Sequence, residues 1–185
     1  KKLIKKYPTS KILITRMDVS KESSIKKVVK KIKKKKVKLY CLINNAAIDA
    51  KVKKNQKMLN SSSFEKVLLQ DWEKHLSVGL TGAMLCSKYF GRMIVSNKSG
   101  GVIINVASDL SVIAPNHRIY SKGVFKPVMY SVVKHGIIGL TKYTASYWGD
   151  RKVRCNTLAP GGINQNFDNS FVNKISSIDP TKIPL

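Results

Sequence analysis

The sequence predicts an α/β protein built on a doubly wound parallel sheet, with helices on both faces in three layers. Two observations predict this fold: short apolar segments alternate with segments of helical periodicity, and short polar motifs follow several of the apolar segments. Ligands of such sheets bind beyond the carboxyl ends of the strands, where these motifs would lie. With 185 residues, 43% of them apolar, the chain is long enough for one domain with its own core.

Strand and helix patterns follow one another along the whole chain. Apolar runs predict strands at residues 11–15, 37–43, 101–107 and 152–156. Apolar residues at helical spacing predict helices at residues 21–36, 71–96 and 128–149. Ser20 is suited to cap the first of these helices, and the polar residues 51–63 predict a surface segment. Because no repeat or linker divides the chain, we expect a single domain over residues 1–185.

The formal net charge of +25 raises the possibility of nucleic-acid binding. In the densest basic run, residues 26–38, apolar side chains recur at helical spacing, which puts the lysines on the solvent face of an amphipathic helix. Aromatic residues that could stack on bases do not interleave with this run. We therefore favour a solvated helix face and expect no nucleic-acid partner.

The cysteines, histidines and apolar runs argue against several other classes of site. Cys41, Cys86 and Cys155 form no CxxC pair and lie in apolar stretches, so we expect buried free thiols and a reducing, cytoplasmic compartment. The three histidines lack metal-ligand spacing, so we expect no metal. Since no apolar run is long enough to cross a bilayer, we expect no membrane partner. An upstream targeting segment stays open, because the chain starts at Lys1.

A serine, a tyrosine and a lysine follow one another as Ser108, Tyr130 and Lys134. The tyrosine and the lysine are four residues apart in a predicted helix, so their side chains share one face, one turn apart. An ammonium group beside a phenol favours the phenolate and lowers the phenol pKa from about 10, which permits proton transfer near neutral pH. The same spacing recurs at Tyr7 and Lys11, so the order of several motifs carries the argument.

Taken in this order, the motifs resemble those of the short-chain dehydrogenase/reductase family over nearly the whole chain. The resemblance covers the Asp after a strand, a turn close to Asn-Asn-Ala-Gly, a strand that ends in serine, the Tyr-x-x-x-Lys pair and a Pro-Gly loop. The matching segments are Asp18-Val19, Asn44-Asn45-Ala46-Ala47, residues 104–108 ending in Ser108, Tyr130 with Lys134, and Pro160-Gly161-Gly162-Ile163. Ala47 stands where the family has glycine.

The resemblance implies a Rossmann-like fold and an enzyme that transfers a hydride between NAD or NADP and a carbonyl or alcohol substrate, a sugar or sugar derivative being one candidate. It implies that Tyr130 is the general acid or base, that Ser108 binds the substrate oxygen, and that Lys134 supports the tyrosine and holds the ribose. Gly79 aligns with an asparagine of the family's catalytic set. The implied cofactor-binding residues are Asp18, Val19, Asn44, Asn45, Ala46, Tyr130, Lys134, Pro160, Gly161 and Ile163.

Three departures from the family pattern matter. No glycine-rich, phosphate-binding turn precedes Lys11, and the chain ends before the family's last helix and strand, so it resembles a fragment incomplete at both ends. We expect residues 1–185 alone to be inactive, and the complete protein to form a homo-oligomer. Gly79 removes a side chain but keeps its carbonyl, which would weaken a proton relay without removing it. Residues 109–129 form a longer interval than in most relatives, either a surface insertion or a loop that shapes access, and its basic residues would suit an anionic substrate.

Each candidate also has a structural interpretation. Ser108 could merely end a strand, Asn44 and Asn45 could form a turn, and Asp18 could cap a helix. A rival function remains for the whole chain: a non-catalytic remnant or binding module that keeps the fold without cofactor binding.

Overall fold

The computed structural model describes residues 12–48, 63–120, 122–162 and 169–178, and a parallel sheet lies at its centre. The strands are β1 (Cys41–Asn44), β2 (Gly101–Val106) and β3 (Val153–Leu158), with β2 in the middle. Both pairs of neighbours are parallel. The carboxyl ends of all three strands therefore meet at one edge of the sheet.

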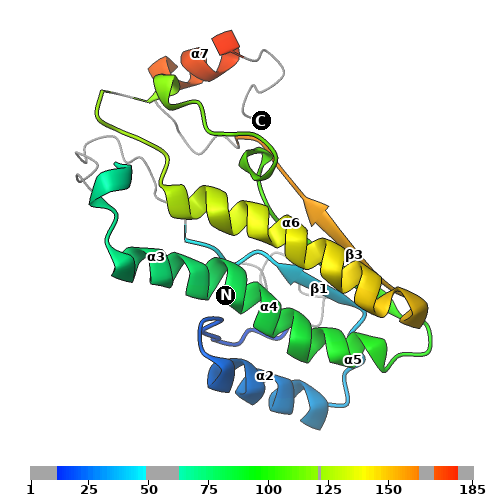
Figure 1. The fold of residues 1–185 in the computed structure, drawn as a ribbon. Coiled ribbons are helices and arrows are strands. Elements are labelled where there is room, and N and C mark those ends of the chain that lie inside the picture. The colour runs from blue at the N-terminus through cyan, green and yellow to red at the C-terminus, as the bar shows by residue number, and fades with distance from the viewer. Residues whose placement is uncertain (1–11, 49–62, 121, 163–168, 179–185) are drawn as a thin grey trace.

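Helices cover one face of this sheet (Figure 1). They are α2 (Glu22–Lys34), α6 (Val128–Trp148) and a long helical segment between them. The long segment runs through α3 (Leu69–Leu76), a π turn η3 (Ser77–Thr81), α4 (Gly82–Cys86), a second π turn η4 (Ser87–Gly91) and α5 (Arg92–Val95). The three predicted helices are confirmed, and a parallel sheet with flanking helices confirms the predicted fold class. In the described residues these helices lie on one face of the sheet, and the helices expected on the other face stay a prediction.

The remaining helical elements are short. They are the 3-10 turns η2 (Phe64–Lys66), η5 (Asp109–Ser111), η6 (His117–Ile119) and η7 (Gly149–Arg151), and the helix α7 (Asn169–Ile178). Two contacts among them concern the carboxyl edge of the sheet: η5 packs against α6, and α7 packs against η6.

The core lies between the sheet and the helices. Ile103 of β2 and Val153 of β3 face it and are almost completely buried. On α2, Ile25, Val28 and Val29 face the core, while the lysines of this helix are exposed. The periodicity of this basic segment therefore gives the amphipathic helix that the sequence predicts, with its charge in solvent.

Two predicted strands differ from the structure. The described residues 12–15 form no strand, and Ile12, Leu13 and Ile14 are exposed. A strand needs a hydrogen-bonded neighbour, and among the described residues the sheet contains only β1, β2 and β3. The predicted buried strand at 37–43 is shortened to Cys41–Asn44, and Ile43 is 58% exposed. Side chains alternate between the two faces of a strand, and helices of the described residues cover only one face.

The prediction of three buried thiols is correct for two cysteines. Cys86 and Cys155 are buried, and this burial raises the pKa of each thiol to about 11. Cys41 is exposed, because it lies on the uncovered face of β1. The prediction is therefore wrong for Cys41.

The start of α2 also differs from the prediction. The N-cap residue is Lys21, and no side chain caps the helix. The Ser20 hydroxyl instead donates to Oδ1 of Asp18 at 2.6 Å, so the predicted cap is wrong. The Asp18 backbone carbonyl accepts from Lys21 N at 3.2 Å.

A polar cluster joins α2 to the long helical segment. The Tyr89 hydroxyl and Lys88 Nζ both donate to Oε1 of Glu22, the latter at 3.3 Å, and Lys26 Nζ lies 3.6 Å from the other carboxylate oxygen. The hydrogen bond from Tyr89, followed by that from Lys88, lowers the pKa of Glu22 below its ordinary value.

None of the helices in the described ranges is both long and apolar enough to cross a lipid bilayer.

Candidate functional site

Polar residues of the predicted site lie at the carboxyl edge of the sheet. Asn44 is the last residue of β1, Ser108 follows β2 by two residues, and Pro160 follows β3 by two residues. The parallel register pairs Asn44 with Asn105, and Asn105 with Thr157. The expectation that these motifs fall at strand ends is therefore correct for all three strands.

The Ser108 hydroxyl donates one hydrogen bond and accepts another. It is 6% exposed, and its Oγ donates to Oδ1 of Asp109 at 2.8 Å. The same oxygen accepts from Leu110 N at 3.3 Å. The backbone N–H of Asp109 donates to the Pro160 carbonyl at 3.1 Å, which ties the serine turn to the loop after β3.

Tyr130 and Lys134 lie on α6, one turn apart. Lys134 is 6% exposed, and its Nζ donates to the Val106 carbonyl at 2.8 Å, two residues before Ser108. The same Nζ lies 5.6 Å from the centroid of the Tyr130 ring. The structure thus brings the lysine, the tyrosine and the end of β2 together.

A second lysine lies over the Tyr130 ring. Lys126 Nζ is 3.7 Å from the ring centroid, closer than Lys134 and within the range of cation–π attraction. Lys126 precedes the tyrosine by four residues, and Pro127 between them is the N-cap of α6. Sequence reasoning missed Lys126 as a partner of the tyrosine, although the spacing of four residues was available as a signal.

Asn44 makes its hydrogen bonds inside the protein. Its Nδ2 donates to Oδ1 of Asn105 at 2.8 Å, to Oγ of Ser87 at 3.0 Å and to the Ala83 carbonyl at 3.4 Å. The side chain therefore joins β1 to β2 and to the long helical segment. Asn45 and Ala46, the next two residues of the predicted cofactor-binding turn, are exposed.

The network continues across the sheet to α6. Asn105 is fully buried, and its Nδ2 donates to Oγ1 of Thr141 at 2.9 Å. Thr157 donates to the same hydroxyl at 2.9 Å, and that hydroxyl donates to the Ile137 carbonyl at 2.8 Å. Sequence reasoning missed Asn105 and Thr141. The available signal was a polar residue on the core-facing side of the predicted strand, for Asn105, and of the predicted helix, for Thr141.

Gly79 lies where the long helical segment crosses α6. It is buried within the π turn η3, and a Cβ at this position would lie 2.6 Å from Cγ1 of Val133, the neighbour of Lys134. The backbone at Gly79 forms a π turn, a feature frequent at functional sites. The glycine also permits a close approach that any larger residue would disturb.

The remaining predicted cofactor residues lie before α2 and after β3. Asp18 is exposed, and hydrogen bonds from Ser20 lower the pKa of its carboxyl. Val19 is half-buried and packs on Gly82, where a Cβ would lie 2.9 Å from Cγ2 of the valine. Gly161 is exposed, and Ile163 lies outside the described residues.

The long interval after Ser108 is anchored at two points. The rings of His117 and Phe125 meet edge to face, with centroids 5.4 Å apart, and η6 packs against α7. This interval also contains Lys126, described above. Both interpretations of this interval, a surface insertion and a loop that shapes substrate access, stay predictions.

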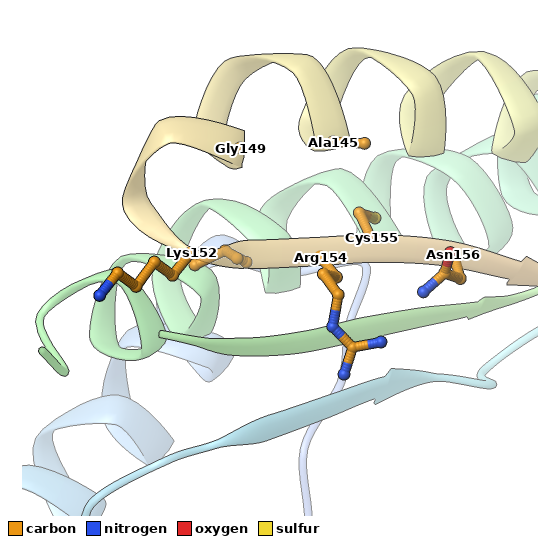
Figure 2. Close-up of a pocket in the computed structure, with 7 residues that line it drawn as sticks. Ala145, Gly149, Lys152, Arg154, Cys155 and Asn156 are labelled. Atoms are coloured by element: carbon orange, nitrogen blue, oxygen red, sulfur yellow. The ribbon is translucent and has the colours of Figure 1, made fainter. Parts of the chain in front are cut away.

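An open pocket of about 540 Å³ lies away from the predicted site. It lies along β3 and the end of α6 (Figure 2), towards the amino end of the strand. Its lining residues are Ala145, Gly149, Lys152, Val153, Arg154, Cys155 and Asn156. None of these is a predicted site residue. Within the described ranges, no three side chains of His, Cys, Asp or Glu lie close enough together to hold a metal ion.

Known proteins are similar to this chain in sequence and in fold. The family model described as enoyl-(acyl carrier protein) reductase matches residues 1–182. The short chain dehydrogenase/reductase dpfgG of Gibberella zeae is 34% identical over 172 residues, which cover 89% of this chain and 56% of that protein. The NAD-dependent glycerol dehydrogenase of Listeria innocua is 29% identical over 151 residues, covering 82% of this chain and 52% of that protein.

A solved structure has the same fold. The short chain dehydrogenase of Leptospira borgpetersenii with bound NAD+ superposes with a TM-score of 0.80 at 26% identity. The match covers 92% of this chain and 62% of that one. The chain thus spans little more than half the length of the curated relatives named above.

Proposed function

Because the chain belongs to the short-chain dehydrogenase/reductase family, whose members are NAD(P)-dependent oxidoreductases, we propose that the full-length product of its gene transfers a hydride between NAD or NADP and a carbonyl or alcohol substrate. The single observation that supports this most is the meeting of three groups at one end of the sheet. Lys134 reaches the Val106 carbonyl, two residues from Ser108, and lies beside the Tyr130 ring.

The chemistry of these groups fits a nicotinamide cofactor at the carboxyl edge. Parallel α/β sheets bind their ligands at this edge, and Asn45, Ala46 and Gly161 are exposed there. When bound, the cofactor would supply the hydride chemistry. Lys134 would then exchange its bond to the Val106 carbonyl for the ribose hydroxyls, and the loop at Pro160 and Gly161 would hold the nicotinamide end.

Proton transfer falls to Tyr130, the general acid in reduction and the general base in oxidation. The ammonium groups of Lys126 and Lys134 lie 3.7 Å and 5.6 Å from its ring centroid, and positive charge beside a phenol stabilises the phenolate that forms when the phenol gives up its proton. Tyr130 is also the third residue of α6, where the partial positive charge of the helix N-terminus acts in the same direction. Ser108 would donate to the substrate oxygen and stabilise its developing charge.

The substrate we propose is a sugar or a related polyol. The similar protein of Listeria innocua is named as a glycerol dehydrogenase, and its substrate carries hydroxyls on neighbouring carbons. We further propose a cytoplasmic homo-oligomer without a nucleic-acid or membrane partner.

The test is an assay of the full-length product with NAD+ and NADP+ and a panel of alcohols, with reduced nicotinamide measured by its absorbance. Lys134→Ala should lower both the turnover rate and the affinity for nucleotide, because one side chain serves the tyrosine and the ribose. Lys142→Ala, an exposed lysine of the same helix, is the matched control and should change neither. A Lys134→Ala protein with normal nucleotide affinity would contradict the ribose contact. Nucleotide binding without turnover on any substrate would favour a binding module.

A further inference from the structure

A second cation lies over the ring of the predicted catalytic tyrosine. Lys126 Nζ is 3.7 Å from the centroid of the Tyr130 ring, whereas Lys134 Nζ is 5.6 Å from it. The Lys134 ammonium also donates to the Val106 carbonyl at 2.8 Å. The Tyr-x-x-x-Lys motif contains only the lysine that follows the tyrosine, so Lys126 is a partner that the motif does not include.

The backbone before α6 brings Lys126 close to the tyrosine. Pro127, the N-cap of the helix, is buried and has φ −59°. A proline restricts the residue before it to an extended conformation, which limits the directions from which Lys126 can enter the helix. The Tyr130 N–H donates to the Pro127 carbonyl at 3.0 Å and fixes the tyrosine relative to this turn. Local structure therefore places the lysine beside the ring.

A cation over a ring face responds to the protonation state of the phenol. The face of a neutral phenol attracts an ammonium weakly. When the phenol loses its proton, the ring and its oxygen carry a full negative charge, which an opposite charge within about 4–6 Å stabilises. An ammonium 3.7 Å from the centroid is close to every ring carbon, including the one that bears the oxygen. Both side chains are half-buried, which limits screening by water.

Other charged groups also lie on the elements that pack against α6. Near the tyrosine these are Asp109 of η5 and the half-buried Asp71 and His75 of α3, while β2 and η3 contribute none. Arg154 of β3 and the charged residues of η7 lie by the other end of the helix. A carboxylate opposes the effect of a lysine on a phenol. Because these groups stay the same in every variant compared below, a difference between variants reports the side chain at position 126.

We propose that Lys126 is a positioning residue for Tyr130, a second cation that lowers the pH at which the tyrosine exchanges its proton with the substrate oxygen. Its role in turnover rests on the proposed function, whereas its contact with the ring requires neither cofactor nor substrate. In oxidation the phenolate takes the proton of the alcohol, and in reduction the phenol gives its proton to the carbonyl oxygen. Loss of the Lys126 charge therefore slows oxidation near neutral pH and extends reduction to higher pH.

The experiment compares charge variants of the full-length product. Lys126→Met removes the charge and keeps most of the side-chain length, and Lys126→Arg keeps the charge. Lys142→Met, at an exposed lysine of the same helix, is the control. Thermal unfolding checks that all three variants fold.

Two quantities are measured for each protein. The first is the ionisation pH of Tyr130 without cofactor, from NMR of tyrosine labelled at the ring carbon that bears the oxygen, with the signal assigned by Tyr130→Phe. The second is the pH dependence of kcat/KM for oxidation and for reduction. The NMR titration does not depend on turnover, so it tests the contact separately from the proposed reaction.

We expect Lys126→Met to raise the ionisation pH of Tyr130 by about 0.5–1 unit, since a nearby opposite charge shifts a pKa by about 1–3 units and solvent weakens the effect at a half-exposed pair. The acid limb of the oxidation profile should move up with it, which lowers kcat/KM about three- to tenfold at neutral pH. The alkaline limb of the reduction profile should move up as well. Lys126→Arg should retain most of the wild-type behaviour, and Lys142→Met should retain all of it.

An ionisation pH of Tyr130 that is the same in wild type and Lys126→Met would overturn the inference. An equal rise in Lys126→Met and Lys126→Arg would also overturn it, because the effect would then come from packing and not from charge. A rise in KM for anionic substrates with unchanged pH profiles would place Lys126 on the substrate and overturn it too. A raised ionisation pH in a protein that turns over no substrate would support the contact with Tyr130 and contradict the proposed function alone.

Discussion

The two ends of the sheet are held together in different ways, one by hydrogen bonds between side chains and the other by close backbone packing at glycines. At the carboxyl end, side chains hydrogen-bond to one another: Asn44 to Asn105 across two strands, and Asn105 to Thr141 of α6. At the amino end, backbone groups meet directly at two glycines. A Cβ at Gly100 would lie 2.0 Å from the Lys152 carbonyl oxygen, and one at Gly101 would lie 2.3 Å from the Tyr40 carbonyl oxygen.

This difference separates positions that stabilise the sheet, at the amino end, from positions of the proposed site, at the carboxyl end. At the amino end, the positions of Gly100 and Gly101 leave no space for a side chain, so backbone packing requires glycine at both. At the carboxyl end some residues, such as Asn105, are buried and hydrogen-bonded, and others, such as Asn45 and Gly161, are exposed. Substitution at the carboxyl end can therefore alter ligand binding without removing the backbone contacts of the sheet.

The largest expected change in stability is at the amino end. Gly100 has φ +68°, so Gly100→Ala would combine a strained left-handed backbone with a clash against Lys152. We expect a loss of about 3 kcal/mol or more in the free energy of unfolding, measured by urea denaturation. Gly123 is a matched control, with φ +76° and no atom within 4 Å of an added Cβ. Gly123→Ala should cost only about 1 kcal/mol. Equal losses at the two glycines would refute the contrast drawn between the two ends.

The next largest effect tests the side-chain network of the carboxyl end. Asn105→Ala would remove the hydrogen bonds that the buried Asn105 side chain makes to Asn44 and Thr141 and would leave a cavity between the sheet and α6, so we expect a loss of about 2–3 kcal/mol in unfolding free energy. The control is Asn156→Ala, because Asn156 is an exposed residue of β3. It should change the free energy of unfolding by less than about 0.5 kcal/mol. A loss at Asn105 no greater than that of the control would mean that the network does not hold this end together.

A smaller effect concerns the crossing of the long helical segment and α6. Gly79→Asn, which introduces the asparagine of the family, would place a Cβ 2.6 Å from Val133, and overpacking of this kind costs about 1–3 kcal/mol. Val133→Ala in the same protein should recover about half of that loss. The double-mutant cycle in unfolding free energy measures the coupling. A cycle without coupling would show that the two residues do not meet.

The smallest effect is expected on α2, far from both ends. The folded-state pKa of Glu22 is below its ordinary value of about 4.5, so its contribution to stability is present above that pH and is lost as the pH falls through the folded-state pKa. The difference in unfolding free energy between wild type and Glu22→Gln should therefore be constant near neutral pH and shrink in acid. Glu73→Gln, an exposed glutamate of α3, is the control. A difference that grows in acid would contradict the assignment.

The sequence was most informative where local pattern and tertiary packing agree. The strand at 101–107 and the helix at 128–149 were predicted within two residues, because periodicity, flanking glycines and motif order point the same way. The positions of Ser108, Tyr130 and Lys134 followed from strand ends and helical spacing. Their roles were not determined by spacing and remain proposals.

What the sequence could not show depends on contacts between distant segments. Residues 12–15 would need a hydrogen-bonded neighbour to form a strand, and the exposure of Cys41 depends on which face of the sheet is covered. No local pattern records either. The π turn at Gly79 lies where the chain passes Val133 at short range, a contact between two separate helices. The Asp109 N–H donates to the Pro160 carbonyl, a contact between two distant segments that no local pattern records.

The central claim is that the carboxyl end performs acid–base chemistry through Tyr130. The most direct test is Tyr130→Phe in the full-length product, compared with Tyr143→Phe, an exposed tyrosine of the same helix. We expect Tyr130→Phe to lower kcat by about 10²–10⁴-fold while nucleotide affinity, measured by calorimetric titration, stays within about threefold of wild type. Tyr143→Phe should change neither quantity. A Tyr130→Phe protein that retains near-normal turnover would contradict the assignment of this tyrosine.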